Sequence, residues 1–136
     1  MAPPREELVR TAELRTALRR LLRRTEEAAT DHGLTAQRYD LLLQIAAGDD
    51  GESTVGELTE RLHLGQTAVS EIVKRAIGAG LVDRRQSAKD GRVGLLCLTP
   101  EGERRLQATF DALEADRNAF LRAYRDLGKR VRAYTN

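Results

Sequence analysis

The side chains between Gln66 and Arg92 are the ones whose types and spacing could do chemistry, and that chemistry is binding rather than catalysis. Their first group carries amide, hydroxyl and cationic groups at helical spacing: Gln66, Thr67, Ser70, Lys74 and Arg75. Amides and hydroxyls can hydrogen-bond to base edges in a major groove, and lysine or arginine more often contacts phosphate. The group therefore predicts a surface that reads a duplex. The alternative is a polar helix face that is only solvated.

The second group lies in the stretch GLVDRRQSAKDGRVGLLCLT, from Gly80 to Thr99. Its charged members of interest are Arg84, Arg85, Lys89, Asp90 and Arg92. Gly91 permits a tight bend, and Asp90 can hold the Arg92 guanidinium in one orientation. An oriented arginine that projects from a turn suits the narrow, electronegative minor groove of DNA. The alternative is an arginine that is merely solvated in a polar turn.

A pair of short helices must position the first group. Thr54 and Glu57 fit a capping box that starts one helix, which ends near Gly65. The next helix begins near Gln66, ends at Gly80 and has one apolar stripe, made of Val69, Ile72, Val73, Ala76 and Ile77. Two short helices joined by a few residues, the second amphipathic, are the helix-turn-helix pattern.

Two short segments, Leu81 to Gln86 and Val93 to Leu98, position the second group as the arms of a β-hairpin. Leu96 and Leu98 alternate with Cys97, so one side of the second strand can pack on the helices. We expect Cys97 to be a buried structural cysteine, and the alternative is a redox sensor.

Longer helices flank these elements. One starts near Arg5 and ends at Gly33, and the last segment opens on Thr99 as an N-cap. A heptad-like seam then covers one face of the last segment: Leu106, Phe110, Leu113, Phe120, Tyr124, Leu127 and Val131. A seam this long cannot be buried against so small a body. We therefore expect a partner chain to cover the rest of it, together with Leu14 and Leu18 of the first helix.

Composition excludes several classes of protein. The chain has 136 residues, 40% of them hydrophobic, and its 23 basic residues nearly match its 21 acidic ones for a net charge of +2. This balance suits one globular domain with an appended arm and does not by itself indicate nucleic-acid binding. Aromatic residues make up only 4%, which argues against a base-stacking single-strand binder. Without a spanning or signal segment, and with one cysteine, we expect a soluble cytoplasmic protein.

No catalytic or metal-ligating set stands out in the sequence. The spacing gives no nucleophile elbow, no phosphate-cradling glycine loop and no serine or cysteine paired with a histidine. His32 and His63 have no cysteine or histidine at ligand spacing, and the acidic loop of Asp49, Asp50 and Glu52 is best explained as a solvated turn. We therefore expect no enzyme activity, no metal and no cofactor.

The order of elements and several short motifs resemble the MarR family (multiple antibiotic resistance regulators). The motifs are TVGELTERL from Thr54, QTAVS from Gln66, GLVDRR from Gly80, DGR from Asp90 and LTPEG from Leu98. The resemblance implies a homodimeric winged-helix transcription factor whose first and last helices form the dimer interface. It also implies a response to small, often phenolic, ligands.

The same resemblance implies roles for the two groups of residues. Gln66, Thr67, Ser70 and Lys74 match the exposed face of the recognition helix, Arg84 and Arg85 open the wing, and Asp90 braces Arg92 at its tip. Three features depart from the family pattern. Glu71 stands where a basic residue is common and either repels phosphate or accepts from a cytosine amino group. Gly65 replaces a serine or threonine cap, and the short tail after Gly102 predicts fused or trimmed closing helices.

We therefore predict a mainly α fold with a small β-hairpin wing, that is, a winged helix-turn-helix with N- and C-terminal dimerisation helices. Its parts are an N-terminal dimerisation helix (1–33), a DNA-binding region (34–99, with the recognition helix at about 66–79 and the wing at about 82–98), and one or more C-terminal dimerisation helices (100–136). The predicted function is that of a homodimeric repressor that binds a pseudo-palindromic operator in double-stranded DNA and is released by a small aromatic or phenolic effector. The alternatives are a winged-helix module for protein–protein contact and a redox- or metal-responsive regulator.

Overall fold

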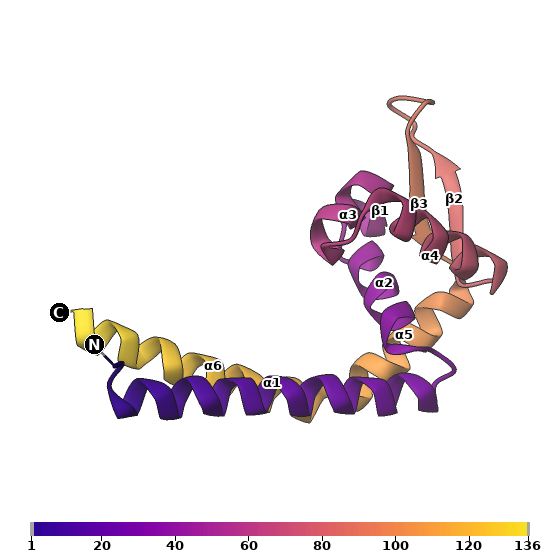
Figure 1. The fold of residues 1–136 in the computed structure, drawn as a ribbon. Helices are drawn as coiled ribbons and strands as arrows, with labels where there is room; N and C mark the ends of the chain where they lie inside the picture. The colour runs from indigo at the N-terminus through magenta and orange to yellow at the C-terminus, as the bar shows by residue number, and fades with distance from the viewer. Residues whose placement is uncertain (1, 136) are drawn as a thin grey trace. The chain divides into compact units, whose positions relative to one another are not determined.

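The computed structural model describes the backbone of residues 2–135 and the side chains of residues 2–129, so Val131 of the predicted seam lies outside the described side chains. The elements follow in the order α1 (Arg5–Asp31), α2 (Ala36–Ala46), the short 3-10 helix η1 (Asp49–Gly51), β1 (Glu52–Ser53), α3 (Val55–Leu62), α4 (Gln66–Gly78), β2 (Val82–Gln86), β3 (Gly94–Leu98), α5 (Pro100–Ala112) and α6 (Glu114–Thr135) (Figure 1). The predicted fold class, mainly α with a small β wing, is confirmed.

Contacts divide the chain into two units. The winged-helix unit comprises residues 29–109, and the helical unit comprises residues 1–28 and 110–136. None of the helices in the described part of the chain has both the length and the apolar composition needed to cross a membrane.

The core of the winged-helix unit is built around α2. Thr35 caps this helix by accepting a hydrogen bond from the Arg38 backbone N–H at 3.0 Å. The largest fully buried side chains of the unit come from α2, α3, α4 and the strands: Leu41, Leu42, Ile45, Leu58, Val69, Val73, Leu81, Val82 and Leu96. Aliphatic side chains therefore supply most of this core, as the low aromatic content requires.

The sheet has three antiparallel strands in the order β1–β3–β2. β2 and β3 pair from Val82 opposite Leu98 to Gln86 opposite Gly94, and this pair forms the predicted hairpin. β1 was not predicted, because a strand of two residues, Glu52 and Ser53, is too short to show any alternation. It pairs with the inner end of β3 and so fixes the wing to the helices of the unit.

The LTPEG motif joins the sheet to α5 through a tight approach of two backbones. Thr99 accepts a hydrogen bond from the Gly102 N–H at 3.0 Å, and its hydroxyl donates to the Gly80 carbonyl at 2.6 Å. A Cβ on Gly102 would lie 2.1 Å from the Leu81 carbonyl oxygen, which no side chain could tolerate. Glycine is therefore required at position 102 for α5 to start against the end of α4.

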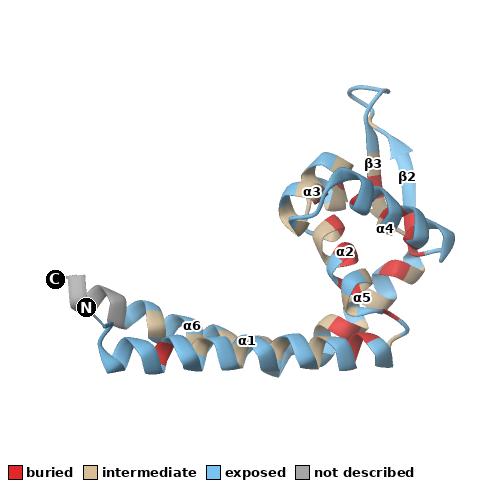
Figure 2. Ribbon diagram, viewed as in Figure 1, coloured by how far each residue is buried: buried red, intermediate tan, exposed pale blue. Residues whose placement is uncertain are grey.

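The helical unit consists of most of α1, the end of α5 and α6. Arg24 on α1 bonds Asp116 on α6 at 3.4 Å and Glu27 on its own helix at 2.5 Å, and these bonds raise the pKa of Arg24 above its usual value. Among the side chains described in this unit, only Arg10, Ala28 and Leu113 are buried. Figure 2 shows the resulting contrast, because buried residues cluster in the winged-helix unit and are sparse along α1 and α6.

The last segment, predicted as one or more helices that could be fused or trimmed, forms two separate helices. α5 ends at Ala112 and α6 begins at Glu114, so both closing helices are present despite the short tail. At the junction the Leu113 N–H bonds the Phe110 carbonyl, three residues back, at 3.2 Å. The Arg117 guanidinium stacks 3.6 Å from the Phe110 ring centroid and bonds the same carbonyl. The sequence pattern did not indicate this break, because the apolar spacing continues across it.

Candidate nucleic-acid interface

Local contacts define where α3 begins and ends, whereas α4 begins without a side-chain cap. The predicted capping box is confirmed: the Glu57 backbone N–H donates to the Thr54 hydroxyl oxygen at 3.1 Å, and the Thr54 N–H donates to the Glu57 carboxylate at 3.2 Å. His63 then ends α3 in a left-handed conformation, with φ of 53°. Gly65 precedes α4 without any side-chain cap, so the backbone alone starts this helix.

The face of α4 that points away from the core carries the whole first group of predicted residues. Val69, Val73 and Ala76 are buried on one side of the helix. The polar residues that were predicted to contact DNA are all exposed: Gln66, Thr67, Ser70, Lys74 and Arg75. α4 therefore presents amide, hydroxyl and cationic groups on one open helical surface.

The tip of the wing is organised by two short side chains. Ser87 accepts from the backbone N–H groups of Lys89 and Asp90, and the Asp90 carboxylate accepts from the Arg92 backbone N–H at 3.0 Å. The expected contact between Asp90 and the Arg92 guanidinium is not the one found. An aspartate two residues before a backbone N–H closes a local turn in this way, so Asp90 shapes the chain on which Arg92 stands rather than its side chain. Lys89, Asp90 and Arg92 are all exposed.

The two arginines at the base of the wing differ in their surroundings. Arg85 forms an ion pair with Glu52 of β1, whose side chain is only 12% exposed. Arg84 alternates with Arg85 along β2, and its side chain runs past Gly94 on the neighbouring strand. Part of the Arg85 charge is therefore neutralised within the unit, and Arg84 is the more available cation. Glu52, expected in a solvated turn, is instead a structural partner of the wing.

A second anchoring network near β1 was also missed. The buried Ser53 hydroxyl lies 3.3 Å from the carbonyl oxygens of both Gln44 and Ile45. Arg61 of α3 reaches across to bond the Gln44 carbonyl at 2.9 Å and the Ser53 hydroxyl at 3.0 Å. These bonds hold α2, β1 and α3 together beneath the wing. They depend on groups brought together only by folding, so no spacing in the sequence could have indicated them.

Cys97 is not the buried cysteine that we expected. Its side chain is half-buried and borders a cavity of about 450 Å³ together with Glu52, Arg85 and Leu106. The reason lies in strand alternation, because Leu96 takes the fully buried face of β3 and Cys97 takes the other face. Among the described residues, no cluster of histidine, cysteine and carboxylate side chains could hold a metal ion.

The seam residues lie in both units and differ in exposure. Leu14, Phe110, Phe120 and Leu127 are half-buried, whereas Leu18 and Tyr124 are 38% and 60% exposed. Leu106 lies in the winged-helix unit. Leu113 is only 1% exposed within a single chain, so it packs inside that chain, and its place in an interface with a second chain stays a prediction. The rest of the seam keeps apolar surface that the chain does not cover by itself.

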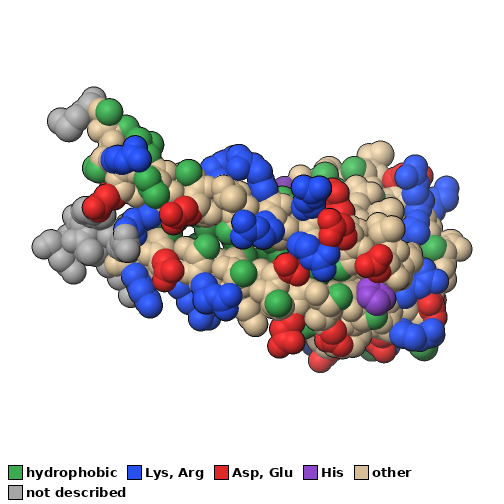
Figure 3. Space-filling model, turned by 90° about the horizontal axis from the view of Figure 1, so that it is seen from below, with side chains coloured by type: hydrophobic (Ala, Val, Ile, Leu, Met, Phe, Trp, Pro, Cys, Tyr) green, Lys and Arg blue, Asp and Glu red, His purple; other side chains and the backbone are tan. Residues whose placement is uncertain are grey.

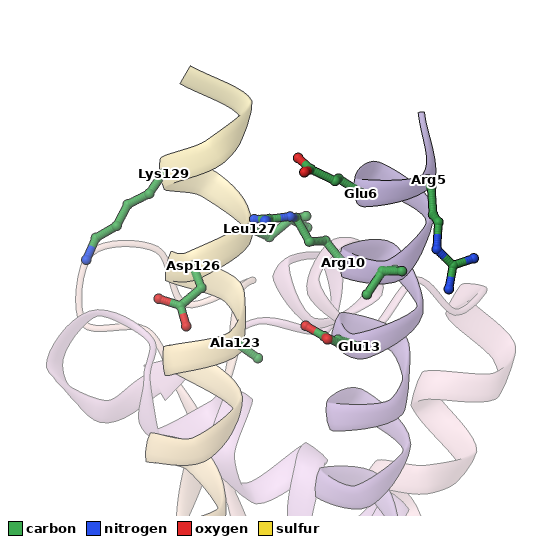
Figure 4. Close-up of a pocket in the computed structure, with 9 residues that line it drawn as sticks. Arg5, Glu6, Arg10, Glu13, Ala123, Asp126, Leu127 and Lys129 are labelled. Atoms are coloured by element: carbon green, nitrogen blue, oxygen red, sulfur yellow. The ribbon is translucent and has the colours of Figure 1, made fainter. Parts of the chain in front are cut away.

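A cavity of about 740 Å³ lies between the start of α1 and α6 in the helical unit. Figure 4 shows Arg10 reaching from α1 across this space toward Leu127, with Glu13 on the same helix and Asp126 on α6. Arg10 is 9% exposed, and its Nε has no hydrogen-bond partner among the described residues. A buried guanidinium nitrogen without a partner is costly.

Comparison with known proteins agrees with this geometry. A family model described as the MarR family matches residues 32–93, which include α2, α3, α4 and most of the wing. A curated relative from Bacillus subtilis, the uncharacterized HTH-type transcriptional regulator YdgJ, is 29% identical over 83 residues. The match covers 61% of this chain and 48% of the relative, so the chain spans about half the length of the curated protein.

Solved structures share the fold over nearly the whole chain. A MarR family transcription regulator has a TM-score of 0.74 and 22% sequence identity, with 96% of this chain and 91% of that chain covered. A MarR mutant from Escherichia coli, complexed with operator DNA, has a TM-score of 0.64 and 20% identity over 88% of this chain and 80% of that one. At this level of identity the likeness shows the fold.

Proposed function

We propose that the chain, whose residues 32–93 a MarR family model matches, is a transcriptional regulator that binds a specific site in double-stranded DNA. The observation that carries the proposal is the joint exposure of two groups in one unit. The polar face of α4 is open, α4 packs against β2, and the wing that β2 opens holds Lys89 and Arg92 exposed at its tip. A helix in the major groove with an arginine in the adjacent minor groove is a recurrent mode of recognition.

The proposal assigns roles to the residues by chemistry. Gln66, Thr67 and Ser70 contact base edges, because amides and hydroxyls can donate and accept there. The phosphate contacts come from Lys74, Arg75, Arg84 and Lys89, with a smaller contribution from Arg85 because of its ion pair with Glu52. Arg92 enters the minor groove from the turn that Asp90 closes.

We propose that two copies act together through the helical unit. Few of its described side chains are buried, while Leu8, Leu22 and Tyr124 are 53%, 56% and 60% exposed. On the face shown in Figure 3, hydrophobic side chains lie between rows of charged ones in the part of the picture nearest the chain ends. A second copy with the same faces would cover these side chains by two-fold symmetry, as in most soluble oligomers. Two recognition helices about 34 Å apart would then read a pseudo-palindrome.

Repression and release by a small aromatic or phenolic effector complete the proposal, and they rest on membership of the family. Repression follows if the operator overlaps a promoter, because a bound dimer would exclude the polymerase. The effector would act by changing the separation of the two recognition helices, which must match the half-site spacing for both to bind. A screen of phenolic acids for loss of operator binding tests this part separately.

A salt titration tests the DNA-binding proposal. We expect the full-length protein to bind a duplex from its own upstream region with a steep dependence on salt, losing roughly 10³-fold or more in affinity between about 50 and 200 mM. Lys74→Gln should lower the slope by about one unit per half-site. Lys129→Gln, which removes an exposed lysine of α6, is the control and should leave the slope unchanged. Shallow salt dependence, or affinity no higher than for unrelated duplexes, would overturn the proposal.

A further inference from the structure

The outward face of α4 carries a carboxylate at its centre. The buried residues Val69 and Val73 each lie two positions from Glu71, and two residues of an α-helix turn through about 200°. Glu71 therefore lies almost opposite the side of α4 that packs on the core, and its side chain is 54% exposed. Any duplex that the polar face of α4 contacts must meet this carboxylate.

The neighbours of Glu71 on the helix are polar or cationic. Thr67 lies one turn before it, and Lys74 and Arg75 lie one turn after it, all exposed. The Arg75 Nε is 3.4 Å from a Glu71 carboxylate oxygen, and both side chains are more than half exposed. So exposed an ion pair is weak and easily exchanged for other partners. The ion pair partly neutralises the Glu71 carboxylate in the free protein and leaves the Glu71 and Arg75 side chains able to contact DNA.

A carboxylate in the major groove has few favourable partners. The phosphates repel it, and most base atoms at the groove floor are hydrogen-bond acceptors, as a carboxylate is. The donors are the amino groups of cytosine and adenine. Adenine places its N7 acceptor beside the amino group, so the second carboxylate oxygen would face a lone pair. Cytosine presents the amino donor without such an acceptor and is the complementary base.

We propose that Glu71 is a specificity-determining residue that selects cytosine at one position in each half-site, by accepting a hydrogen bond from the N4 amino group. This inference rests on the proposed DNA-binding function and names part of the sequence that the site would have. The repulsion between carboxylate and acceptor atoms makes the residue selective against the other bases as well as for cytosine.

Selection of bound duplexes from a random library, with full-length protein, tests this role. For the wild type we expect one position per half-site at which cytosine is preferred roughly tenfold. In Glu71→Gln the preferred base at that position should change to adenine, because a carboxamide can donate to N7 while it accepts from N6. Glu71→Ala should lose the preference at that position and keep it elsewhere. Glu60→Gln, which removes an exposed carboxylate of α3, should keep the wild-type preference.

The outcomes separate this inference from the function on which it rests. If the wild type selects a site but Glu71→Gln and Glu71→Ala select the same bases at every position, the role of Glu71 is refuted and DNA binding stands. A wild-type preference for an A·T pair at the position that changes would also refute it. If the wild type enriches no sequence, both the DNA-binding function and the role of Glu71 fail.

Discussion

The winged-helix unit and the helical unit differ in how far they bury their large apolar side chains. In the winged-helix unit, Leu41, Leu42, Ile45 and Leu58 are all 0% exposed. In the helical unit, Leu22 is 56% exposed, although the apolar residues of this unit recur at the same helical spacing as those of the winged-helix unit. The first unit therefore has a core of its own, whereas the second leaves apolar side chains exposed that the proposed dimer would cover.

The same substitution made in both units tests this difference in burial most directly. Leu42→Ala should lower the free energy of unfolding by about 2–5 kcal/mol, because it leaves a cavity in a closed core. Leu22→Ala should change the unfolding of the isolated chain by no more than about 0.5 kcal/mol, because the leucine is largely exposed there. Urea unfolding at low protein concentration measures both. Equal losses in the two variants would contradict the contrast between the units.

The next test introduces charge at matched exposed leucines. Leu18 in the helical unit and Leu64 in the winged-helix unit are both 38% exposed. Leu18→Glu should weaken dimerisation by roughly 3 kcal/mol or more, about 100-fold, because it places an unpaired carboxylate from each chain in an apolar interface. Leu64→Glu should leave the dimer intact. Sedimentation velocity over a range of concentrations distinguishes them, and a Leu18→Glu protein that stays dimeric would show that the interface lies elsewhere.

The features that the sequence predicted correctly depend on contacts between residues that are close together in the chain. The starts of α3 and α4 were predicted correctly, and the capping box at Thr54 shows that local chemistry is enough to set the first of them. The exposed face of α4 also follows from helical periodicity. Local signals of this kind act over a few residues and so remain visible in the sequence.

The features that were missed depend on contacts between distant residues. β1 and the ion pair of Glu52 with Arg85 exist because a short segment meets β3. Cys97 is half-buried for a related reason, since Leu96 takes the inner face of the strand. Apolar spacing predicts which residues can be buried but not which neighbour covers them.

In the wing, an exposed arginine is expected to contribute to DNA affinity and not to the stability of the fold. Arg92→Ala should weaken operator binding by about 1–3 kcal/mol without a measurable change in unfolding, because the side chain is exposed and contributes no core packing. Arg122→Ala removes an exposed arginine of α6 and should leave binding unchanged. Fluorescence anisotropy with a labelled duplex measures both. Equal losses of affinity in the two variants would mean that general charge, rather than the wing, explains binding.

Two substitutions of Asp90 test whether the local turn or a direct contact between carboxylate and guanidinium positions Arg92. Asp90→Asn keeps a side-chain oxygen that can accept from the Arg92 N–H, and Asp90→Ala removes it. If the turn is what places Arg92, Asp90→Asn should bind nearly as tightly as the wild type. Asp90→Ala should lose part of the Arg92 contribution. A full loss in Asp90→Asn would instead favour a direct contact between the carboxylate and a guanidinium.

The smallest expected effect concerns the ion pair between Glu101 and Arg105 in α5. A hydrogen bond from Arg105 holds the pKa of Glu101 below its usual value of 4.5, and the same arginine bonds the Gly33 carbonyl at 3.0 Å. Because the folded state binds fewer protons at Glu101 than the unfolded state does, the stabilisation is complete above pH 4.5 and is lost as the pH falls through the lower folded-state pKa. Glu101→Gln should therefore lower Tm slightly at neutral pH and flatten its decline in acid. Glu103→Gln, on the same turn of α5, controls for the loss of one carboxylate, and an acid decline equally steep in Glu101→Gln and the wild type would exclude Glu101 as its cause.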